Sequence, residues 1–227
     1  MLVKEWMATD PITVEEDTSI MKVTQLLKEH SFRRVPVVRR KKLVGIVSDR
    51  DIKEAAPSKA TSLDVHELYY LLSEIKVKDI MTPNPLTLKE DDSVEKAAVI
   101  MLENRISGMP VVDDDNHVIG LVTQTDIFKV MISITGIYRG PIQFACEIED
   151  KPGYLTRFLS SLSNLGARMV SVLTCQDHVT SDKREVYVRI MHMDNDKLDH
   201  MVTELKKDFN VLYVLREELT DIPHKAN

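Results

Sequence analysis

Cysteine, aromatic residues and long hydrophobic runs are scarce in this chain of 227 residues. The two cysteines, Cys146 and Cys175, lie in segments with strand periodicity, and no CxxC or Cys/His spacing typical of a zinc site occurs. Aromatic residues make up 5% of the chain, which leaves few side chains on which bases could stack. The hydrophobic runs have strand length, far below the roughly 20 residues of a membrane helix. These shortages argue against a disulfide scaffold, a zinc fold and a membrane-spanning protein.

The chain also lacks an excess of positive charge and an export signal. Its net charge is -6 and its pI is about 5.7, so no general affinity for nucleic acid or for an anionic membrane is expected. The segment Met1–Glu5 has no hydrophobic run of the secretory type. We therefore expect a cytoplasmic protein with reduced thiols, no nucleic-acid or membrane partner, and any anion bound locally.

Catalytic signatures are missing as well. The seven histidines are scattered, none forms HxxxH, and neither GxxxxGK[ST] nor GxGxxG occurs. No Ser/His/Asp or Cys/His set can be placed in one cleft by its spacing. We therefore expect no enzyme, no catalytic cofactor and no metal site. The alternative, a small enzyme with an unrecognised site, has no residues to support it.

What the chain does contain is a duplicated unit. Segment 35–52 reads VPVV, a charged turn and LVGIVSDRDI, and segment 109–127 reads MPVV, a turn and VIGLVTQTDI. A recurrence of this length indicates two copies of one structural unit. The second copy has one extra residue in turn 113–117, and two copies of one fold would tolerate an insertion confined to a turn.

Each copy has the pattern of a β-α-β-β-α unit. In the first copy, Pro11 introduces a short strand, and Thr18 or Ser19 caps a helix with apolar residues at spacings of three and four. Two apolar runs around a basic turn then predict a hairpin, and a second helix follows. The predicted bounds are 1–56 for the first repeat, 57–76 for a helical connector and 77–135 for the second repeat.

The Pro-Val-Val, Gly-[Ile/Leu]-Val and [Ser/Thr]-x-x-Asp-Ile elements occur in this order twice, and this pattern resembles a tandem pair of CBS domains, or Bateman module. The resemblance covers residues 1 to about 132. It implies an α+β fold in which the two repeats pack as a pseudo-twofold pair. It also implies clefts that bind an adenosine-containing effector of the AMP, ADP, ATP, NAD or S-adenosylmethionine class.

The repeated Ser/Thr-x-x-Asp has two interpretations. It is a capping box, which typically stabilises a helix by ~1 kcal/mol. An Asp that follows a Gly-x-Val strand end, where a ligand can approach the backbone, can also accept both hydroxyls of a ribose. The CBS resemblance assigns that ribose role to Asp51 and Asp126, with Ser48 and Thr123 contacting ribose or phosphate. Capping and ligand contact can coexist.

Basic residues precede only the first copy. Arg33 and Arg34 stand where the second copy has Ser107 and Gly108. In similar modules, basic side chains at these positions reach ligand phosphates, so unequal pockets are expected; the alternative is a solvated surface pair. The resemblance also places the adenine against two segments of the repeats. The residues assigned to that contact are Asp10, Ile12, Thr13, Asn84, Leu86 and Thr87.

The last third changes character after a boundary rich in Gly and Pro at residues 136–141. Strand and helix patterns alternate in the order βαββαβ, the ferredoxin-like split unit. The motif Asp-x-Pro-Gly-x-Leu in this order resembles an ACT domain over residues 140–218, which leaves 219–227 as a tail.

The ACT resemblance implies a role in dimerisation or in binding a second small effector, such as an amino acid. Amides after Gly153, at the start of a helix, would suit a carboxylate. The alternative is that Pro152 and Gly153 only shape the helix entry. Arg168 stands where many amino-acid-binding members have Asn. Dimerisation or coupling is therefore favoured at least as much as amino-acid binding. The residues assigned to this effector site are Asp150, Pro152, Gly153, Tyr154 and Leu155.

Two CBS repeats followed by an ACT domain resemble the AcuB acetoin-utilisation family. The sequence therefore predicts a freestanding regulator that senses an adenosyl ligand, forms a homodimer through its CBS or ACT domains, and acts on a partner that the sequence does not name. A constitutive assembly scaffold without ligand sensing is the alternative.

Overall fold

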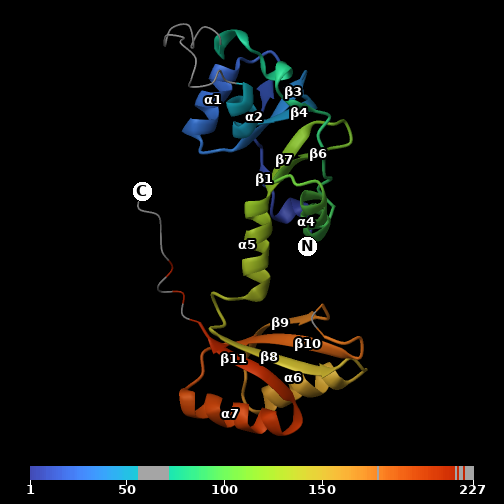
Figure 1. Ribbon diagram of the computed structural model, residues 1–227, viewed down its shortest axis with the longest axis vertical. Helices are drawn as coiled ribbons and strands as arrows, with labels where there is room; N and C mark the ends of the chain where they lie inside the picture. Colours follow the sequence, from blue (N-terminus) through green and yellow to red (C-terminus); the bar gives the residue numbers. More distant parts are fainter. Residues whose placement is uncertain (56–71, 178, 218, 220–221, 223–227) are drawn as a thin grey trace. The chain divides into compact units, whose positions relative to one another are not determined.

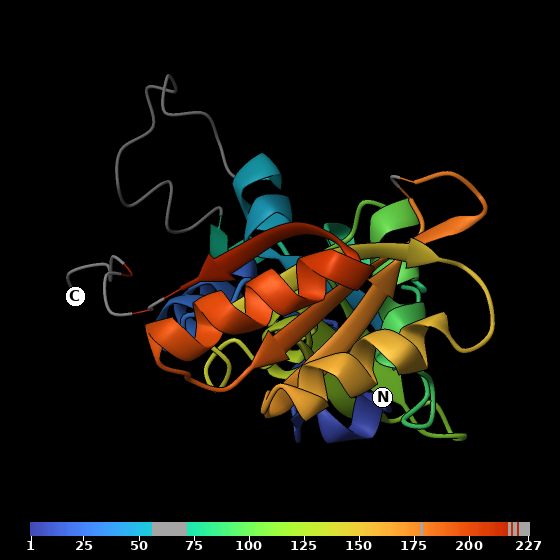
Figure 2. The same ribbon diagram turned by 90° about the horizontal axis from the view of Figure 1, so that it is seen from below.

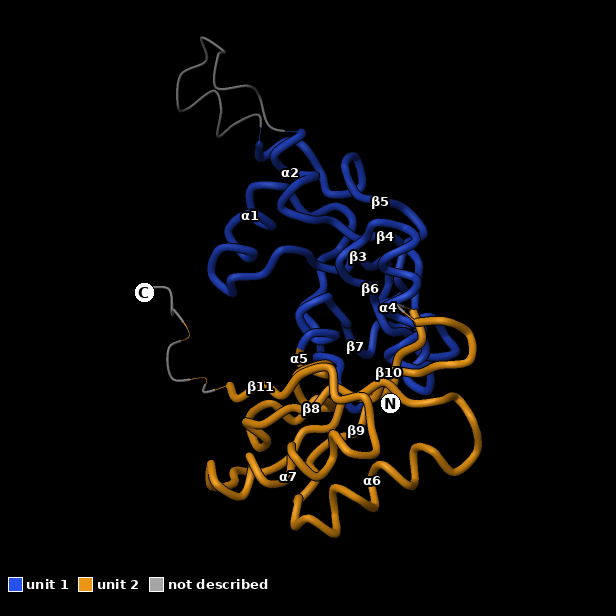
Figure 3. Tube along the Cα trace, turned by 60° about the horizontal axis from the view of Figure 1, so that its bottom comes forward, with its two compact units in different colours: residues 1–128 blue, residues 129–227 orange. Residues whose placement is uncertain are grey.

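The computed structural model describes residues 1–55, 72–177, 179–217, 219 and 222 (Figure 1). The chain forms two compact units, residues 1–128 and 129–227, and the division falls inside helix α5 (Gln124–Thr135) (Figure 3). The predicted helical connector lies outside the described residues except for its last five positions. Most of the predicted tail lies outside them as well.

Unit 1 contains both repeats, in the predicted order of helices and strands. The helix α1 (Ile20–Glu29) is capped by Ser19, whose Oγ accepts from the Lys22 amide at 3.4 Å. The other elements of the first repeat are η1 (Val3–Glu5), β1 (Ala8–Thr9), β2 (Val14–Glu15), β3 (Arg34–Arg39), β4 (Lys42–Ser48) and α2 (Asp49–Ala55). The predicted strand after Pro11 is shorter than expected, since β2 pairs with β3 through two residues.

The second repeat has the corresponding elements except for β2. They are η2 (Val77–Asp79), β5 (Thr82–Pro83), α4 (Val94–Glu103), β6 (Gly108–Val112), β7 (Val118–Thr123) and α5. Here the counterpart of β2 is reduced to a single parallel bridge between Leu88 and Val111.

The two repeats exchange their first strands. Strand β1 pairs with β7, with Ala8 opposite Leu121, and β5 pairs with β4, with Thr82 opposite Ile46. These two pairings join equivalent positions of the duplicated sequence, so the exchange is reciprocal. Each short arm therefore completes the sheet of the other repeat.

The exchanged arms also enter the core of the other repeat. Val77 is fully buried in a cluster with Val23, Val35 and Val47 of the first repeat, and its amide donates to Thr18 O at 2.8 Å. At the equivalent position, the Val3 amide donates to the Asp92 carbonyl at 2.9 Å. We conclude that the repeats fold as one unit, because neither has a complete core without the other.

The glycines of the Gly-x-Val elements make room for the exchanged arms. A β-carbon on Gly45 would lie 2.3 Å from the sulfur of Met81, and one on Gly120 would lie 2.3 Å from the sulfur of Met7. The sequence interpretation, in which these glycines let a ligand approach the backbone, is therefore corrected: they admit methionine side chains.

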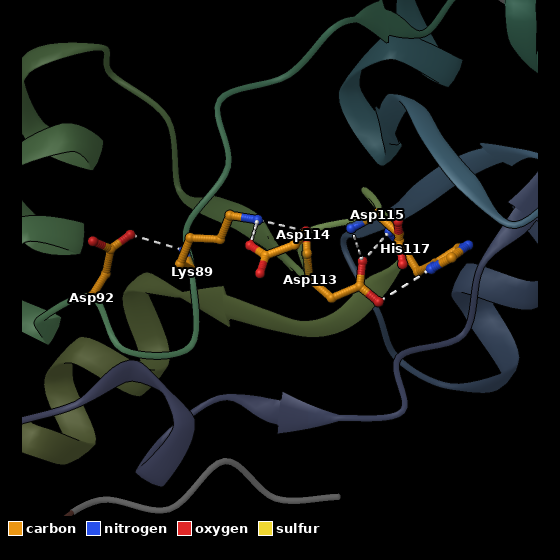
Figure 4. A network of polar contacts seen from close by, with 6 residues as sticks. All are labelled: Lys89, Asp92, Asp113, Asp114, Asp115 and His117. Carbon is orange, nitrogen blue, oxygen red and sulfur yellow. Dashed lines mark hydrogen bonds and ion pairs between the residues drawn. The ribbon is translucent and has the colours of Figure 1, made fainter.

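The two hairpin turns differ, as the extra residue requires. In the second repeat, Asp113 organises the turn: its Oδ1 accepts from the His117 amide at 2.8 Å and the Asp115 amide at 2.9 Å (Figure 4). Lys89 holds the same turn from outside by donating to the Asp113 carbonyl at 2.5 Å (Figure 4). The backbone bond from His117 is the main cause that lowers the pKa of the Asp113 carboxyl. The inserted residue is thus absorbed by a structured turn.

The turn of the first repeat carries backbone strain that substitution should relieve. Arg40 and Lys41 have φ of 51° and 69°, a region that Asn and Gly occupy more readily. The double substitution Arg40→Asn/Lys41→Gly is expected to raise the free energy of unfolding of unit 1 by about 1 kcal/mol, measured by urea denaturation. Lys42→Gly, in the adjoining strand, is the control and should destabilise the unit. Equal or lower stability of the double variant would contradict the strain argument.

Unit 2 has the predicted βαββαβ order. Its elements are β8 (Ile142–Glu149), α6 (Tyr154–Asn164), β9 (Met169–Cys175), β10 (Lys183–Ile190), α7 (Asn195–Asp208) and β11 (Asn210–Arg216). The antiparallel sheet has the order β11-β8-β10-β9, and both helices cover one of its faces (Figures 1 and 2). Phe144, Phe158 and Met201 are fully buried between the helices and the sheet. Among the described residues, no helix is long and apolar enough to cross a bilayer.

Both cysteines are free thiols in unit 2, as the sequence predicted. Burial raises the pKa of Cys146 to about 12, so its thiol stays protonated at neutral pH.

Candidate functional site

Two clefts in unit 1 hold most of the predicted site residues. The first, which we call the Asp51 cleft, has a volume of about 710 Å³ and is lined by parts of segments 46–51, 82–86 and 104–108 together with Arg33 and Arg34. The second, the Thr123 cleft, has a volume of about 540 Å³. Its lining comes from residues 8–12, 31–34, 107, 121, 123–125 and 128.

The strand exchange decides which predicted residues meet. Asn84 and Leu86, which belong to the second repeat, line the Asp51 cleft together with Ser48 of the first. Asp10 and Ile12 of the first repeat line the Thr123 cleft. Each cleft is thus built from the strand end of one repeat and the arm of the other.

Three predicted residues are not in the lining of either cleft. Thr13 lines a third, shallower cleft with Lys41 and His117. Thr87 and Asp126 line none of the clefts described here, and Asp126 is 8% exposed. The sequence pattern could not separate Asp126 from Asp51, because both stand at the same motif position.

Asp51 forms a capping box with Ser48. Its Oδ2 accepts from the Ser48 amide and the Ser48 hydroxyl, each at 2.7 Å, and its own amide donates to Ser48 Oγ at 3.4 Å. Both bonds end on Oδ2, and within the described part of the chain no donor reaches Oδ1. Because a carboxylate has about four acceptor positions, Asp51 can cap the helix and still accept from a ligand.

Asp126 has the same capping geometry. Its Oδ2 accepts from the Thr123 amide at 3.0 Å and from Thr123 Oγ1 at 2.7 Å. Asp126 is buried and does not line the Thr123 cleft, whereas Thr123 does. The two copies of the motif thus present different groups to their clefts.

Arg33 and Arg34 line both clefts. The Arg34 guanidinium crosses to the other repeat, where it donates to the Gly108 carbonyl at 3.3 Å and to the Ser107 hydroxyl. Burial lowers the pKa of Arg34. Its guanidinium stays protonated at neutral pH, as arginine does in proteins. The arginine pair, which is present in only one of the two sequence copies, therefore does not belong to one cleft alone. Both clefts share it.

Gly108 is complementary to Arg34. A β-carbon on Gly108 would lie 2.8 Å from Arg34 Nη1 and 3.0 Å from the Val122 carbonyl. Gly108→Ala is expected to lower the free energy of unfolding by about 1–3 kcal/mol, measured by urea denaturation. In an Arg34→Ala background the loss should be smaller, since one of the two clashes is gone. Strict additivity of the two substitutions would contradict this packing.

The clefts differ in their remaining walls. Phe32 and Phe128, which are 44% and 59% exposed, line the Thr123 cleft. Arg50 and Arg105 line the Asp51 cleft. The sequence analysis did not predict these four residues as part of a site. They could have been found by aligning the two copies, because each stands at a position where the copies differ.

Backbone strain recurs at equivalent positions of the two clefts. Asp10 and Asn84 have φ of 48° and 46°, and Ser31 and Arg105 have φ of 55° and 53°. Asp and Asn adopt this left-handed region more often than other non-glycine residues, which accounts for the first pair. Strain of this kind concentrates at ligand sites.

The predicted effector loop of unit 2 precedes α6. Gly153, with φ of 89°, begins the helix without a side-chain cap. Asp150 is engaged within the fold, where Arg184 contacts its Oδ1 at 2.9 Å and Gln176 donates to its Oδ2. Tyr154 and Leu155 pack against the core. Pro152 remains at the turn, and Arg168 is exposed.

No group of three or more His, Cys, Asp or Glu side chains in the described residues could hold a metal ion.

Comparison with known proteins identifies the duplicated unit. The sequence model for the CBS domain matches residues 3–58 and 77–133. A CBS domain-containing protein of Dictyostelium discoideum is 32% identical over 135 residues, which are 59% of this chain and 93% of that protein. The L-aspartate semialdehyde sulfurtransferase of Methanocaldococcus jannaschii is 37% identical over 131 residues, 57% of this chain. The chain spans only 23% of the length of that enzyme.

Solved structures match the same part of the chain. The CBS-pair protein CBSX2 from Arabidopsis thaliana aligns with a TM-score of 0.51 and 28% identity over 60% of this chain and 96% of that one. A Vibrio cholerae protein assigned to acetoin utilization (AcuB) aligns with a TM-score of 0.51 and 24% identity over 61% and 95%. The second match shows a common fold only.

Proposed function

The chain belongs to the CBS domain family, and from this premise we propose that its CBS pair binds an adenosine-containing ligand and regulates a partner protein rather than catalysing a reaction. The ligand class is that of AMP, ADP, ATP, NAD or S-adenosylmethionine. Binding favours one of two arrangements of the unit, which requires different affinities for them.

The observation that carries this proposal is the arrangement of charges around the Asp51 cleft. The unoccupied Oδ1 of Asp51 suits ribose hydroxyls, since hydrogen bonds to a charged acceptor are among the stronger ones. Arg33 and Arg105 line the same cleft and suit a phosphate. Leu86, 48% exposed in this cleft, offers an apolar surface to the adenine.

The Thr123 cleft is proposed as a second ligand site. Phe32 and Phe128 offer aromatic faces for an adenine, and Thr123 offers a hydroxyl. Asp126 would contribute to the ribose contact only after its surroundings open, because it is buried.

For unit 2 we propose an ACT-like module for dimerisation or a second small effector. Its βαββαβ order and the uncapped start of α6 at Gly153 support this assignment. Leu173, Tyr187, Ala145 and Tyr213 lie in register across the four strands, on the face opposite the helices. Leu173 and Tyr213, at the two ends of this row, are 36% and 45% exposed, while Ala145 between them is fully buried. The exposed ends favour the dimerisation role.

A role in acetoin or carbon metabolism, a cytoplasmic location and a homodimeric state remain predictions from the sequence. So does the identity of the regulated protein. The similarity to part of a longer enzyme supports the idea that such a pair regulates a catalytic protein.

Titration calorimetry with AMP, ATP, NAD and S-adenosylmethionine tests the proposal. We expect at least one of them to bind the full chain below millimolar concentration. At 100 times its dissociation constant, such a ligand should stabilise the fold by about 2.7 kcal/mol, which a thermal shift detects. Absence of binding by all four at millimolar concentration would favour the alternative, a constitutive assembly scaffold.

A further inference from the structure

We infer that the Asp51 and Thr123 clefts are coupled through a single shared arginine, Arg33, so that an anionic ligand in one cleft weakens the binding of a second anionic ligand in the other. This inference rests on the proposed function, because it concerns adenosyl ligands in these two clefts. It adds the direction of their coupling and the residue responsible.

The two clefts share their cationic wall. Arg33, Arg34 and Ser107 are the residues that line both. If each repeat had its own arginine pair, each cleft would hold an anion independently. The second repeat instead has Ser107 and Gly108 at these positions, so one pair serves two clefts.

Arg33 and Arg34 differ in how firmly their guanidinium groups are held in place. Arg34 is held between the repeats by its bonds to Ser107 and Gly108, and a larger residue at 108 would clash with it. Arg33 is exposed, and within the described residues its guanidinium has neither a hydrogen bond nor an ion pair. Arg33 is therefore the group that can turn toward a phosphate in either cleft, and it can serve only one at a time.

The two clefts do not depend on Arg33 equally. The Asp51 cleft has a further exposed cation in Arg105, while Arg50 there is paired with Glu54 at 2.9 Å. Among the residues that the structure describes, Arg33 and Arg34 are the only cations in the lining of the Thr123 cleft. Gln124 and Thr125 stand there in place of Asp49 and Arg50 of the other copy. An anion in the Asp51 cleft that recruits Arg33 thus leaves the Thr123 cleft the weaker anion site. An uncharged adenosine derivative could still bind there between Phe32 and Phe128.

Titrations of the full chain with AMP and with adenosine test this coupling, using Arg33→Gln and, as matched control, Arg40→Gln in the solvated hairpin turn. For the unsubstituted chain and the control, AMP should bind in two steps whose affinities differ by about 10-fold beyond the statistical factor. Adenosine should show no such separation. Arg33→Gln should weaken the tighter AMP step by roughly 3- to 5-fold, while adenosine binding stays unchanged. The two AMP steps should move closer without coinciding, because Arg105 remains in the Asp51 cleft.

Two equal and independent AMP sites in the unsubstituted chain would overturn the coupling and leave the proposed function intact. Separated steps that persist unchanged in Arg33→Gln would overturn the role of Arg33 in the same way. If neither AMP nor adenosine binds at millimolar concentration while another adenosyl compound does, the coupling through a shared phosphate contact is wrong. If no adenosyl compound binds, the proposed function fails.

Discussion

Asp51→Asn is expected to weaken AMP binding in the Asp51 cleft by roughly 10- to 100-fold, because hydrogen bonds to a charged acceptor contribute about 1.5–3 kcal/mol. The amide oxygen of asparagine can still accept from Ser48, which holds the carboxylate at 2.7 Å. The free energy of unfolding should therefore change by less than about 1 kcal/mol. Titration calorimetry and urea denaturation of the same variant measure the two effects separately.

Two further substitutions separate ligand contact from capping. Asp51→Ala removes the cap as well as the ligand contact, so it should add a stability loss of about 1–2 kcal/mol to the same loss of affinity. Asp126→Asn should affect AMP binding less, since Asp126 is buried and does not line the Thr123 cleft. Unchanged affinity in Asp51→Asn would show that the motif acts only as a helix cap.

Arg189→Ala is expected to lower the free energy of unfolding of unit 2 by about 3 kcal/mol. Arg189 is 7% exposed and donates to the Gly140 carbonyl at 3.1 Å, to Gln143 Oε1 at 3.1 Å and to Glu217 Oε2 at 2.7 Å. Its removal leaves these acceptors without their donor and opens a cavity in the sheet face. Gly140, before β8, and Glu217, after β11, lose the side chain that binds both of them.

Hydrogen exchange measures this effect by unit. Amides of β8 and β10 should lose protection in Arg189→Ala, while those of β3 and β4 in unit 1 should not. Arg157→Ala is the control, because the pair with Asp208 at 3.1 Å leaves both side chains 59% exposed and should be worth less than about 1 kcal/mol. Equal effects of the two substitutions would contradict a special role for the buried arginine.

The helices and strands of this fold could be predicted from the sequence because the local spacing of apolar residues determines them. The order of helices and strands in the first repeat and in unit 2 follows from apolar spacing and turn residues, and the structure confirms it. In the second repeat the first predicted strand is reduced to one bridge between Leu88 and Val111. The CBS pair is confirmed by the family match. The ACT assignment and the roles of the site residues remain predictions.

The strand exchange could not be predicted from local patterns. Strands β1 and β5 have two residues each, and the copies are so similar that either arm would satisfy either sheet. The exchange determines which predicted residues meet, as with Asn84 and Ser48. The asymmetry at Arg33 and Arg34 predicted unequal pockets, and this stays a prediction: the pair lines both clefts, while Arg105 lines the Asp51 cleft alone.

The central claim is that an adenosyl ligand occupies the Asp51 cleft, and amide chemical-shift mapping by NMR tests it most directly. On addition of AMP or ATP to the full chain, we expect the largest shifts in segments 46–51 and 82–86, which line this cleft from opposite repeats. The same segments should not respond in Asp51→Asn at an equal ligand concentration. Shifts that are absent from both segments, or confined to unit 2, would contradict the account.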